Sequence, residues 1–393
     1  MNLFDLPPLP EARNFPPGEH APRARRSDPE TSKEAAVAAT RNLTAKQDQV
    51  LNALVYKGTL YYQESATPYG PFPYPLEMRF GVRSMMKSVV APLALLRLAE
   101  VAGPYVLTLK VGDYIKGLDP KFNRVRFIDA ANMATGYGGM GTFKTHPNDT
   151  SDGYLDGDYD AWYTAATVSD MLAQSNRNLR PYPWGPSMVM RYRDHDYFLL
   201  GLALDGFLKS VRGPEADLWD MRATEVFMPI GVHQVRAVRT REQGGLDGVV
   251  WANAGYYLSI DDLAKIALLY QRLGSHNGQQ LLHRQLTKNL LAAKNSINQR
   301  SDASMGTAAS DVEPQKQTLY LMGFHFQRYI GSRSKKLLKI LSMHGAGDNR
   351  VTLFPNGIIS VQIGKAAELP PGEEANSADM TVTLRAIDRM VPF

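Results

Sequence analysis

The spacing of apolar and polar residues changes along this chain, and it predicts strands near both ends with helices between them. Two β-rich pieces surround Lys57-Gly58, a pair typical of a tight hairpin. Four strand-like runs follow near the C-terminus, with short turns at Gly331-Ser332 and Asn356-Gly357. These runs are TLYLMGFHFQRYI, KKLLKILSMHG, RVTLFP and GIISVQIGKA. Because a lone pair of strands is not stable, we expect both ends of the chain to meet in one antiparallel sheet.

Helical periodicity dominates the middle of the chain. We expect helices over residues 28–41, 45–54, 84–102, 162–174, 196–210 and 259–273, and a last one from about Ser377. The predicted fold class is α/β (α+β): an antiparallel sheet built from the N- and C-terminal segments, flanked by helices, with a mostly helical inserted lobe.

The same pattern predicts the domain organisation. Residues 1–27 are rich in proline, and we expect an extended leader that packs loosely or not at all. Residues 28–393 are expected to form a single domain. Its α/β lobe would take about residues 28–83 and 315–393, and its helical lobe about residues 84–314.

Composition narrows the class of protein. The 393 residues include no cysteine, which excludes disulfides, thiolate metal sites and a cysteine nucleophile. The formal net charge is only +5, from 44 Lys and Arg against 39 Asp and Glu, so we expect no nucleic-acid partner. The longest apolar stretch is interrupted by Arg97 and Glu100 and is too short to span a bilayer. With no secretory signal pattern at the start, we expect a cytoplasmic protein without a membrane partner.

The motif Ser-x-x-Lys, in which a lysine can activate a serine, occurs at Ser84–Lys87 and again at Ser332–Lys335. Ser332 falls in a basic hairpin turn, so we interpret that copy as structural. Ser84 opens an apolar helix, on which residues three apart share a face, so the Lys87 amine can reach the Ser84 hydroxyl. N–H groups at a helix N-terminus also favour developing negative charge. The alternative, a helix cap followed by a lysine that packs along the surface, is equally compatible with these four residues.

Two later segments favour the catalytic interpretation. RYRDHDYFLLG places Tyr192 just before a helix, and MHGAGDNRVTLFPNGIISV places His344-Gly345-Ala346-Gly347 between two strands. In this order, the three segments resemble the Ser-x-x-Lys, Tyr-x-Asn and Lys-Thr-Gly or His-x-Gly boxes of one family of serine hydrolases. That family comprises class C β-lactamases, DD-peptidases, β-lactamase-fold esterases and nylon-oligomer hydrolases. Weaker matches, such as FMPIGV and YLMGFHF, extend the resemblance over about residues 50–370.

The resemblance implies a β-lactamase/DD-peptidase-like fold, no cofactor, no metal, and acyl transfer through an ester on Ser84. Lys87 and Tyr192 would handle protons, and the backbone N–H groups of Ser84 and Gly347 would form the oxyanion hole. His344, Gly345 and Ala346 would bind substrate or support the site.

The sequence departs from the family pattern at three positions. Asp194 stands where asparagine is commonest, His344 replaces lysine, and Ala346 replaces glycine. A carboxylate near Lys87 favours its ammonium form, and a charged Lys87 would make the Tyr192 phenol easier to deprotonate. We therefore infer that Tyr192 is the base and that Lys87 and Asp194 are a charged support pair.

The substrate is expected to be a small ester or amide. The loops that we expect to line the cleft are aromatic, which favours an apolar acyl or alcohol group: Tyr69, Phe72, Tyr74, Tyr137, Tyr182 and Trp184. With an ordinary pKa near 6.5, His344 would offer charge to a substrate carboxylate only in acid. We place ester hydrolysis first, short-amide hydrolysis second and β-lactam hydrolysis third. A non-catalytic binding protein on the same fold stays open because of Asp194 and Ala346, and so does the oligomeric state.

Two further patterns are interpreted as loops. Residues 136–141 fit a dinucleotide fingerprint by letters but do not lead into an apolar helix. Asp156, Asp158 and Asp160 alternate as in a calcium loop, but Ala161 occupies the glycine position and Thr167 the bidentate glutamate position.

Overall fold

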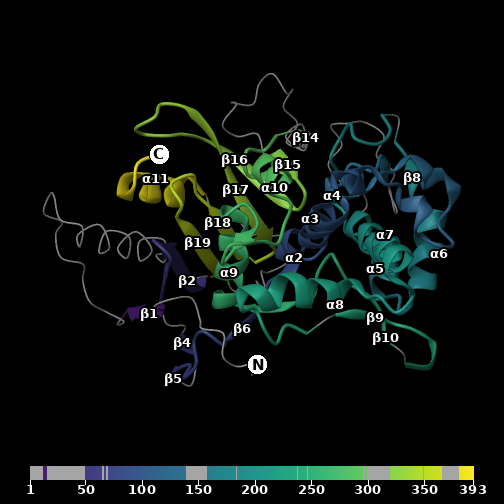
Figure 1. Ribbon diagram of the computed structural model, residues 1–393, viewed down its shortest axis with the longest axis horizontal. Helices are drawn as coiled ribbons and strands as arrows, with labels where there is room; N and C mark the ends of the chain where they lie inside the picture. The colour runs from purple at the N-terminus through teal and green to yellow at the C-terminus, as the bar shows by residue number, and fades with distance from the viewer. Residues whose placement is uncertain are drawn as a thin grey trace, which may run out of the picture.

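The computed structural model of the protein describes residues 12–15, 49–63, 66–67, 70–138, 157–182, 184–236, 238–245, 247–294, 297–298, 319–347, 349–364 and 380–393. Its centre is one sheet made of β1 (Ala12–Phe15), β2 (Gln49–Tyr56), β3 (Thr59–Gln63), β14 (Ile297–Asn298), β15 (Leu319–Leu321), β16 (Phe324–Ile330), β17 (Leu337–Gly345), β18 (Asn349–Leu353) and β19 (Ile359–Gly364). The strand order is β1-β3-β2-β19-β18-β17-β16-β15-β14 (Figure 1).

The two ends of the chain meet where β2 pairs with β19, with Val55 opposite Ile359. The described neighbours in this sheet are antiparallel except β1, which runs parallel to β3. The hairpin at Lys57-Gly58 has both residues at positive φ, 49° and 79°, as a tight two-residue turn requires. The predicted antiparallel sheet of N- and C-terminal segments is confirmed.

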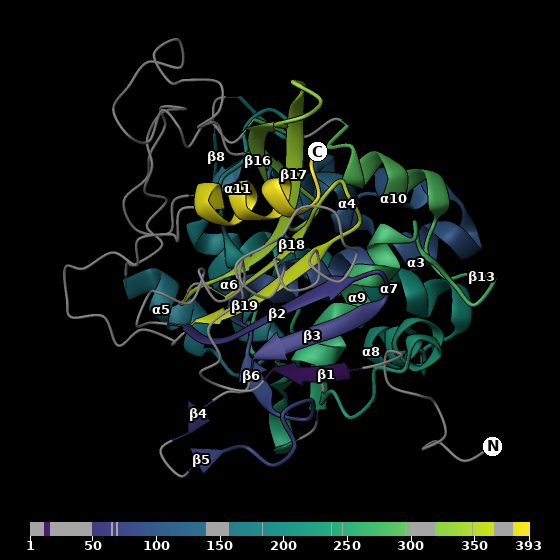
Figure 2. The ribbon, with the colours of Figure 1, turned by 90° about the vertical axis from the view of Figure 1, so that its left-hand side faces the viewer.

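Helices cover both faces of this sheet. The α-helices are α2 (Met86–Val89), α3 (Ala91–Ala102), α4 (Phe127–Ala131), α5 (Gly157–Thr164), α6 (Val168–Asn178), α7 (Asp194–Arg212), α8 (Leu218–Arg222), α9 (Ile260–Gln271), α10 (Arg284–Leu291) and α11 (Met380–Met390). Helix α11 lies on one face over a small core that includes Leu54, Ile340 and Ile387, and α9 lies on the other (Figure 2). Helices α3 to α8 form the helical lobe beside the sheet (Figure 1).

The remaining elements are short. They are the strand pairs β4 (Ala66–Thr67) with β5 (Gly70–Pro71), β6 (Arg79–Gly81) with β11 (Tyr257–Ser259), β7 (Tyr137–Gly138) with β8 (Arg180–Pro181), β9 (Arg239–Arg241) with β10 (Asp247–Val250), and β12 (Ser275–His276) with β13 (Gln279–Gln280). Short turns of 3₁₀ or π helix make up the rest of the regular structure in the described residues: η1 (Arg83–Met85), η2 (Pro104–Thr108), η3 (Val111–Asp113), η4 (Pro120–Arg124), η5 (Ala223–Phe227), η6 (Met228–Ile230) and η7 (Gln243–Gly245). Within the described residues, no helix is both long and apolar enough to cross a membrane.

Three predictions of secondary structure are wrong. The helix expected at residues 45–54 is strand β2 from Gln49 onward. Both faces of β2 are buried, so its apolar residues run on continuously and lose the alternation that marks a half-buried strand. The helix expected at 162–174 is the end of α5 and most of α6, and Thr167 caps the second by accepting a hydrogen bond from the N–H of Asp170. Within the segment expected to be a leader, residues 12–15 form the parallel edge strand β1.

The helix expected at residues 84–102 is broken at Val90. Pro92 has no N–H, so the carbonyl of Ser88 cannot make its helical hydrogen bond to that residue. It accepts one from the Tyr270 hydroxyl instead, at 2.6 Å. The Ser88 hydroxyl donates to the carbonyl of Gly323 at 2.7 Å. The break therefore fixes the short helix that carries Lys87 to both α9 and the β15–β16 turn.

Candidate active site

Ser84 lies in a strained turn between β6 and α2. The residue before it, Arg83, has φ of 51°, a left-handed conformation that is uncommon for a residue other than glycine. The N–H of Val82 donates to the carbonyl of Tyr256, and the N–H of Met85 donates to the carbonyl of Val82, both at 3.1 Å. These bonds hold the turn, and Ser84 stays half-buried at the start of η1. Strain of this kind concentrates at functional sites.

Lys87 is buried next to Ser84, with only 1% of its surface exposed. Its Nζ donates to the Ser84 Oγ at 3.0 Å and to the carbonyl of Asn253 at 3.0 Å. It also forms an ion pair with the carboxylate of Asp194, which is 3% exposed. The structure therefore brings three acceptors around one ammonium group, the number of N–H donors that such a group has.

Asp194 comes from the start of α7, where four consecutive polar side chains are buried. Asp196 accepts from the Thr135 hydroxyl and from the Arg193 guanidinium, each at 3.1 Å. The His195 ring packs on Trp162 with 4.0 Å between ring centroids. Burial, and then the charge of Arg193, lowers the pKa of His195 to about 3. These contacts fix the helix end that presents Asp194 to Lys87.

Tyr192, two residues before α7, lies beside the same lysine. The Lys87 Nζ is 4.9 Å from the centre of the Tyr192 ring. The ring also packs edge-on to Tyr320 at 6.3 Å and near His325 at 6.0 Å between centroids. The structure thus places Tyr192 in one cluster with Ser84 and Lys87, as the chain order of the boxes implied.

The third box reaches the nucleophile turn through Gly345, the last residue of β17. A Cβ at this position would lie 2.3 Å from the Val82 carbonyl oxygen and 3.2 Å from the Met85 nitrogen. Only glycine permits so close an approach of the strand to the turn. Gly345 therefore has a structural role in holding the strand against the residues around Ser84.

His344 connects to the rest of the site through His325, a residue that the sequence reasoning did not single out. Their rings are perpendicular with centroids 5.4 Å apart, and His325 also meets the Tyr320 ring at 5.1 Å. His325 thereby joins the Tyr192 side of the site to the His344 side. The segment YLMGFHF contained a signal for it. Successive side chains of a strand point to opposite faces, and His325 stands between two phenylalanines.

Both histidines are held in the neutral form. Burial, and then the charge of Arg350 opposite His344 on β18, lowers the pKa of His344 to about 4. Burial, and then the neighbouring His344 ring and the cations Arg350 and Lys87, lower the pKa of His325 well below its usual value. The expectation that His344 has an ordinary pKa near 6.5 is therefore wrong, because its environment is less polar and more cationic than the sequence suggested.

Ala346 and Gly347 form the turn between β17 and β18. Ala346 is exposed, and Gly347 has φ of 82°. Asn349, which is buried, donates from Nδ2 to the Ala346 carbonyl at 3.0 Å and to the Gly81 carbonyl at 3.1 Å. Asn349 is a second residue that was not predicted from the sequence, and its amide connects the turn to the strand that leads into Ser84. The backbone N–H groups proposed for the oxyanion hole, those of Ser84 and Gly347, belong to these two turns.

The aromatic residues expected to line the cleft are dispersed. Tyr74 is 65% exposed, whereas Tyr182 is buried and stacks on Trp184 at 4.4 Å between centroids. That stack packs against the guanidinium group of Arg191, 5.5 Å from the Trp184 ring. Tyr69 lies outside the described residues. The stacked pair therefore serves the packing of the helical lobe.

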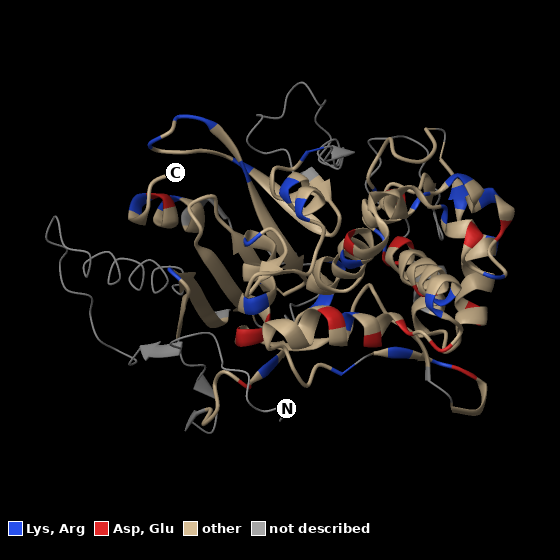
Figure 3. Ribbon diagram, in the orientation of Figure 1, with Lys and Arg blue, Asp and Glu red and all other residues tan. Residues whose placement is uncertain are grey.

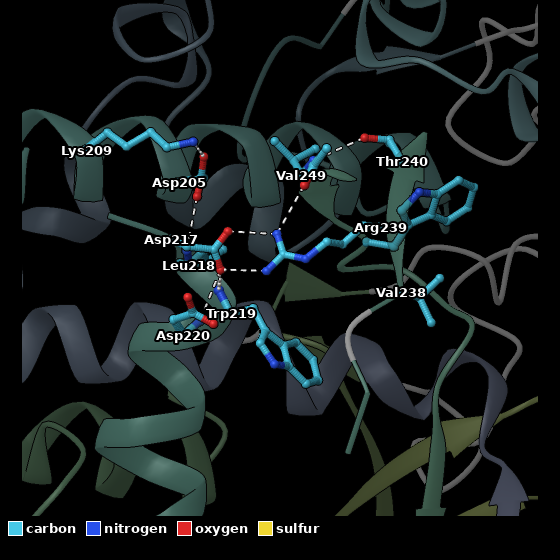
Figure 4. Close-up of polar contacts among 12 residues, drawn as sticks. Asp205, Lys209, Asp217, Leu218, Trp219, Asp220, Val238, Arg239, Thr240 and Val249 are labelled. Carbon is cyan, nitrogen blue, oxygen red and sulfur yellow. Dashed lines mark hydrogen bonds and ion pairs between the residues drawn. The ribbon is translucent and has the colours of Figure 1, made fainter. Parts of the chain in front are cut away.

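A second polar cluster, away from Ser84, has the character of a structural clamp (Figure 4). Asp217 accepts two hydrogen bonds from the Arg239 guanidinium, at 2.7 and 2.8 Å, and caps α8 by accepting from the N–H of Trp219 and Asp220. Burial raises the pKa of Asp217, but these bonds outweigh it and the pKa is lowered. Within the described part of the chain, no group of His, Asp and Glu could hold a metal ion.

Comparison with solved structures confirms the fold class. A protein provisionally assigned as a 6-aminohexanoate-dimer hydrolase from Bacillus anthracis is similar with a TM-score of 0.62 and 16% identity, over 89% of this chain and 81% of that one. A penicillin-binding protein homologue from Pyrococcus abyssi, which is octameric, has a TM-score of 0.59 and 15% identity, over 93% and 77%. A β-lactamase/D-alanine carboxypeptidase from Pseudomonas syringae has a TM-score of 0.57 and 13% identity, over 91% and 98%.

At this level of identity the likeness shows the fold, which is that of the β-lactamase and penicillin-binding serine hydrolases. The resemblance inferred from the sequence is confirmed to that extent. No protein-family model matches the sequence. No curated protein matches it either.

Proposed function

We propose that the protein is a serine hydrolase that forms an acyl-enzyme on Ser84 and acts on small carboxylic esters. The observation that carries this proposal is the buried contact of Lys87 with Ser84, 3.0 Å from Nζ to Oγ. A lysine that is 1% exposed and aimed at a half-buried serine is costly to keep unless it is used. The strained turn before Ser84 also supports a catalytic role for this serine.

The contacts of Lys87 favour a base other than the lysine. Its ammonium group donates to Ser84, to the carbonyl of Asn253 and to Asp194, so its hydrogens are engaged and the charge is balanced. A carboxylate in contact stabilises the charged form of an amine, which then has no lone pair to accept a proton. Tyr192, whose ring centre is 4.9 Å from the Lys87 Nζ, can take a proton, and we assign the base to it.

In the proposed reaction, Tyr192 takes the proton of the Ser84 hydroxyl as the oxygen attacks the ester carbonyl. The backbone N–H groups of Ser84 and Gly347 stabilise the oxyanion, a contribution of roughly 3 kcal/mol for one such donor. The alkoxide leaves with a proton from Tyr192, and water then cleaves the acyl-enzyme by the same steps in reverse order. Lys87 and Asp194 stay charged throughout.

Neutral His344 and His325 favour a neutral substrate. At pH 7.5 neither carries the positive charge that would attract the carboxylate of a β-lactam, since the pKa of His344 is about 4. One observation favours a second candidate, the hydrolysis of short amides that bear a carboxylate. The Arg350 guanidinium, although 6% exposed, is opposite His344 in the sheet and is a permanent cation.

Steady-state kinetics test the choice of substrate. We expect a neutral p-nitrophenyl ester to be hydrolysed with a much higher kcat/KM than nitrocefin at pH 7.5. The same ratio should hold at pH 5.5, because His344 remains neutral there. His344→Lys should lower the KM for nitrocefin if one charged contact is gained. The difference in kcat/KM between the ester and nitrocefin should then shrink by the equivalent of about 1–2 kcal/mol. A wild-type preference for nitrocefin or for a short carboxylate-bearing amide would replace the ester assignment.

A further inference from the structure

The second Ser-x-x-Lys segment lies at the tip of a ribbon that projects from the sheet. Strands β16 and β17 pair from His325 with Ser342 out to Ile330 with Leu337. The neighbouring strands stop earlier, since β15 pairs only as far as Phe326 and β18 ends at Leu353, opposite Leu341. Residues 327–340 therefore form a two-stranded extension beyond the body of the sheet (Figure 1).

This ribbon is strongly basic. Residues 327–340 contain five cationic side chains and no Asp or Glu: Arg328, Arg333, Lys335, Lys336 and Lys339. The formal net charge of the whole chain is also +5, so the rest of the protein is balanced. Blue segments of the ribbon, which mark Lys and Arg, lie at the tip in Figure 3. Arg333, Lys335 and Lys336 are exposed, and among the described residues none of the three forms an ion pair.

Two aliphatic side chains stand beside these charges. Ile330 is 48% exposed and Leu337 is 51% exposed, and they face each other across the two strands. The alternate positions Tyr329 and Leu338 pack toward the core under α11. One side of the ribbon is thus anchored, and the other presents an apolar pair next to a cluster of cations.

The tip is held in a fixed shape by the C-terminal segment. The N–H of Ser334 donates to the Phe393 carbonyl at 2.8 Å, and the N–H of Ser332 donates to the Asp388 carboxylate at 2.7 Å. The Tyr329 hydroxyl donates to the same carboxylate at 2.9 Å. Burial raises the pKa of Asp388, but these hydrogen bonds outweigh it, so the pKa is lowered and its charge serves the turn.

We propose that this ribbon tip docks on an anionic lipid surface. Lysine and arginine near such a surface are attracted to its headgroups, each by about fivefold in affinity, and exposed aliphatic side chains gain by entering the interface. Cations alone would suit nucleic acid equally well. The aliphatic pair favours lipid, because a phosphate backbone has no apolar surface for Ile330 and Leu337 to contact. The exposed turn also lacks the aromatic side chains on which bases stack. Such contact needs no membrane-spanning helix, so it revises the sequence-based expectation of no membrane partner.

Sedimentation of the full-length protein with vesicles tests the proposal independently of its hydrolytic activity. We expect binding to phosphatidylglycerol-containing vesicles at low salt, at least about tenfold weaker binding to pure phosphatidylcholine, and loss of binding in high salt. The triple variant Arg333→Glu, Lys335→Glu, Lys336→Glu should weaken anionic-vesicle binding by at least about a hundredfold. The matched control Lys110→Glu, Lys116→Glu, Arg124→Glu changes exposed cations of the helical lobe and should bind within about twofold of wild type.

The double variant Ile330→Ser, Leu337→Ser separates lipid from nucleic acid. It should weaken vesicle binding about fivefold or more, while leaving any weak binding to a short DNA duplex unchanged. If the triple variant bound anionic vesicles as tightly as the wild-type protein does, the proposal would be overturned. A second pair of results would also overturn it: the double variant binds vesicles as tightly as the wild type, and the wild type binds DNA more tightly than vesicles. These results would assign the tip to nucleic acid.

Discussion

The chain contains the same four-residue pattern in two opposite environments. At Ser84–Lys87 the serine starts a helix behind a strained residue, and the lysine is buried with three acceptors. At Ser332–Lys335 the pattern makes the turn of a projecting hairpin, with Lys335 at φ of 55° and its side chain in solvent. A lysine three residues after a serine therefore does not by itself indicate a catalytic site. What separates the two copies is burial and the supply of acceptors, which residues more than a hundred positions away provide.

The largest difference between the two copies is expected in catalysis. Ser84→Ala should lower kcat/KM for a p-nitrophenyl ester by at least about a thousandfold, because the nucleophile is removed. Ser332→Ala should change it by less than about twofold. Equal effects in two well-folded variants would show that the environment does not distinguish the motifs.

Removing each lysine extends the comparison to stability. Lys87→Met leaves the Asp194 carboxylate buried without its ion-pair partner, and the free energy of unfolding should fall by about 3–5 kcal/mol, with activity lost. Lys335→Met, in solvent, should change it by less than about 0.5 kcal/mol. Urea denaturation measures both.

A compensating substitution checks the reason for that loss. The double variant Lys87→Met, Asp194→Leu should recover much of the stability but none of the activity. If it remains as unstable as Lys87→Met, the unpaired carboxylate is not the cause.

The proposed base gives the next largest effect. Tyr192→Phe keeps the ring that packs near Lys87 and His325, so we expect a stability close to wild type and a kcat lower by at least about a hundredfold. Asp194→Asn should move the alkaline limb of the pH–kcat/KM profile to lower pH, because Lys87 then loses its proton more easily. A fully active Tyr192→Phe enzyme contradicts the assignment.

The last expected effect is a pH dependence of stability from His344. Its pKa is about 4 in the folded protein against about 6.5 when unfolded, so between these values the unfolded state binds more protons. Stability is therefore retained above pH 6.5 and falls as the pH drops toward 4. His344→Gln should reduce the slope of unfolding free energy against pH in this window by up to about 1.4 kcal/mol per pH unit. An unchanged slope, measured by urea denaturation, would show that burial does not hold His344 neutral.

Much of the fold could be predicted because the relevant signals are local. The meander β16 to β19 follows from alternation and from turn residues such as Asn356-Gly357. Strand β2 could not be distinguished from a helix, because an apolar run buried on both faces has no period. The break at Val90 could have been inferred from Pro92, whose missing N–H ends a helical hydrogen-bond pattern.

The candidate site could be predicted only in part. The sequence pointed to residues with chemistry in their side chains, such as Lys87, and to their order along the chain. It could not reveal the Asn253 carbonyl that accepts from Lys87, because any residue supplies a carbonyl. It also missed His325 and the low pKa of His344, since both depend on which strands are adjacent and on how deeply they are buried.

Labelling with a fluorophosphonate probe tests the central claim most directly. The probe reacts with an activated serine, and peptide mass spectrometry then locates the modified residue. The account predicts a single adduct on the peptide that contains Ser84, no adduct on the peptide that contains Ser332, and no labelling of Ser84→Ala. An adduct on another serine, or none on the folded wild-type protein, would contradict it.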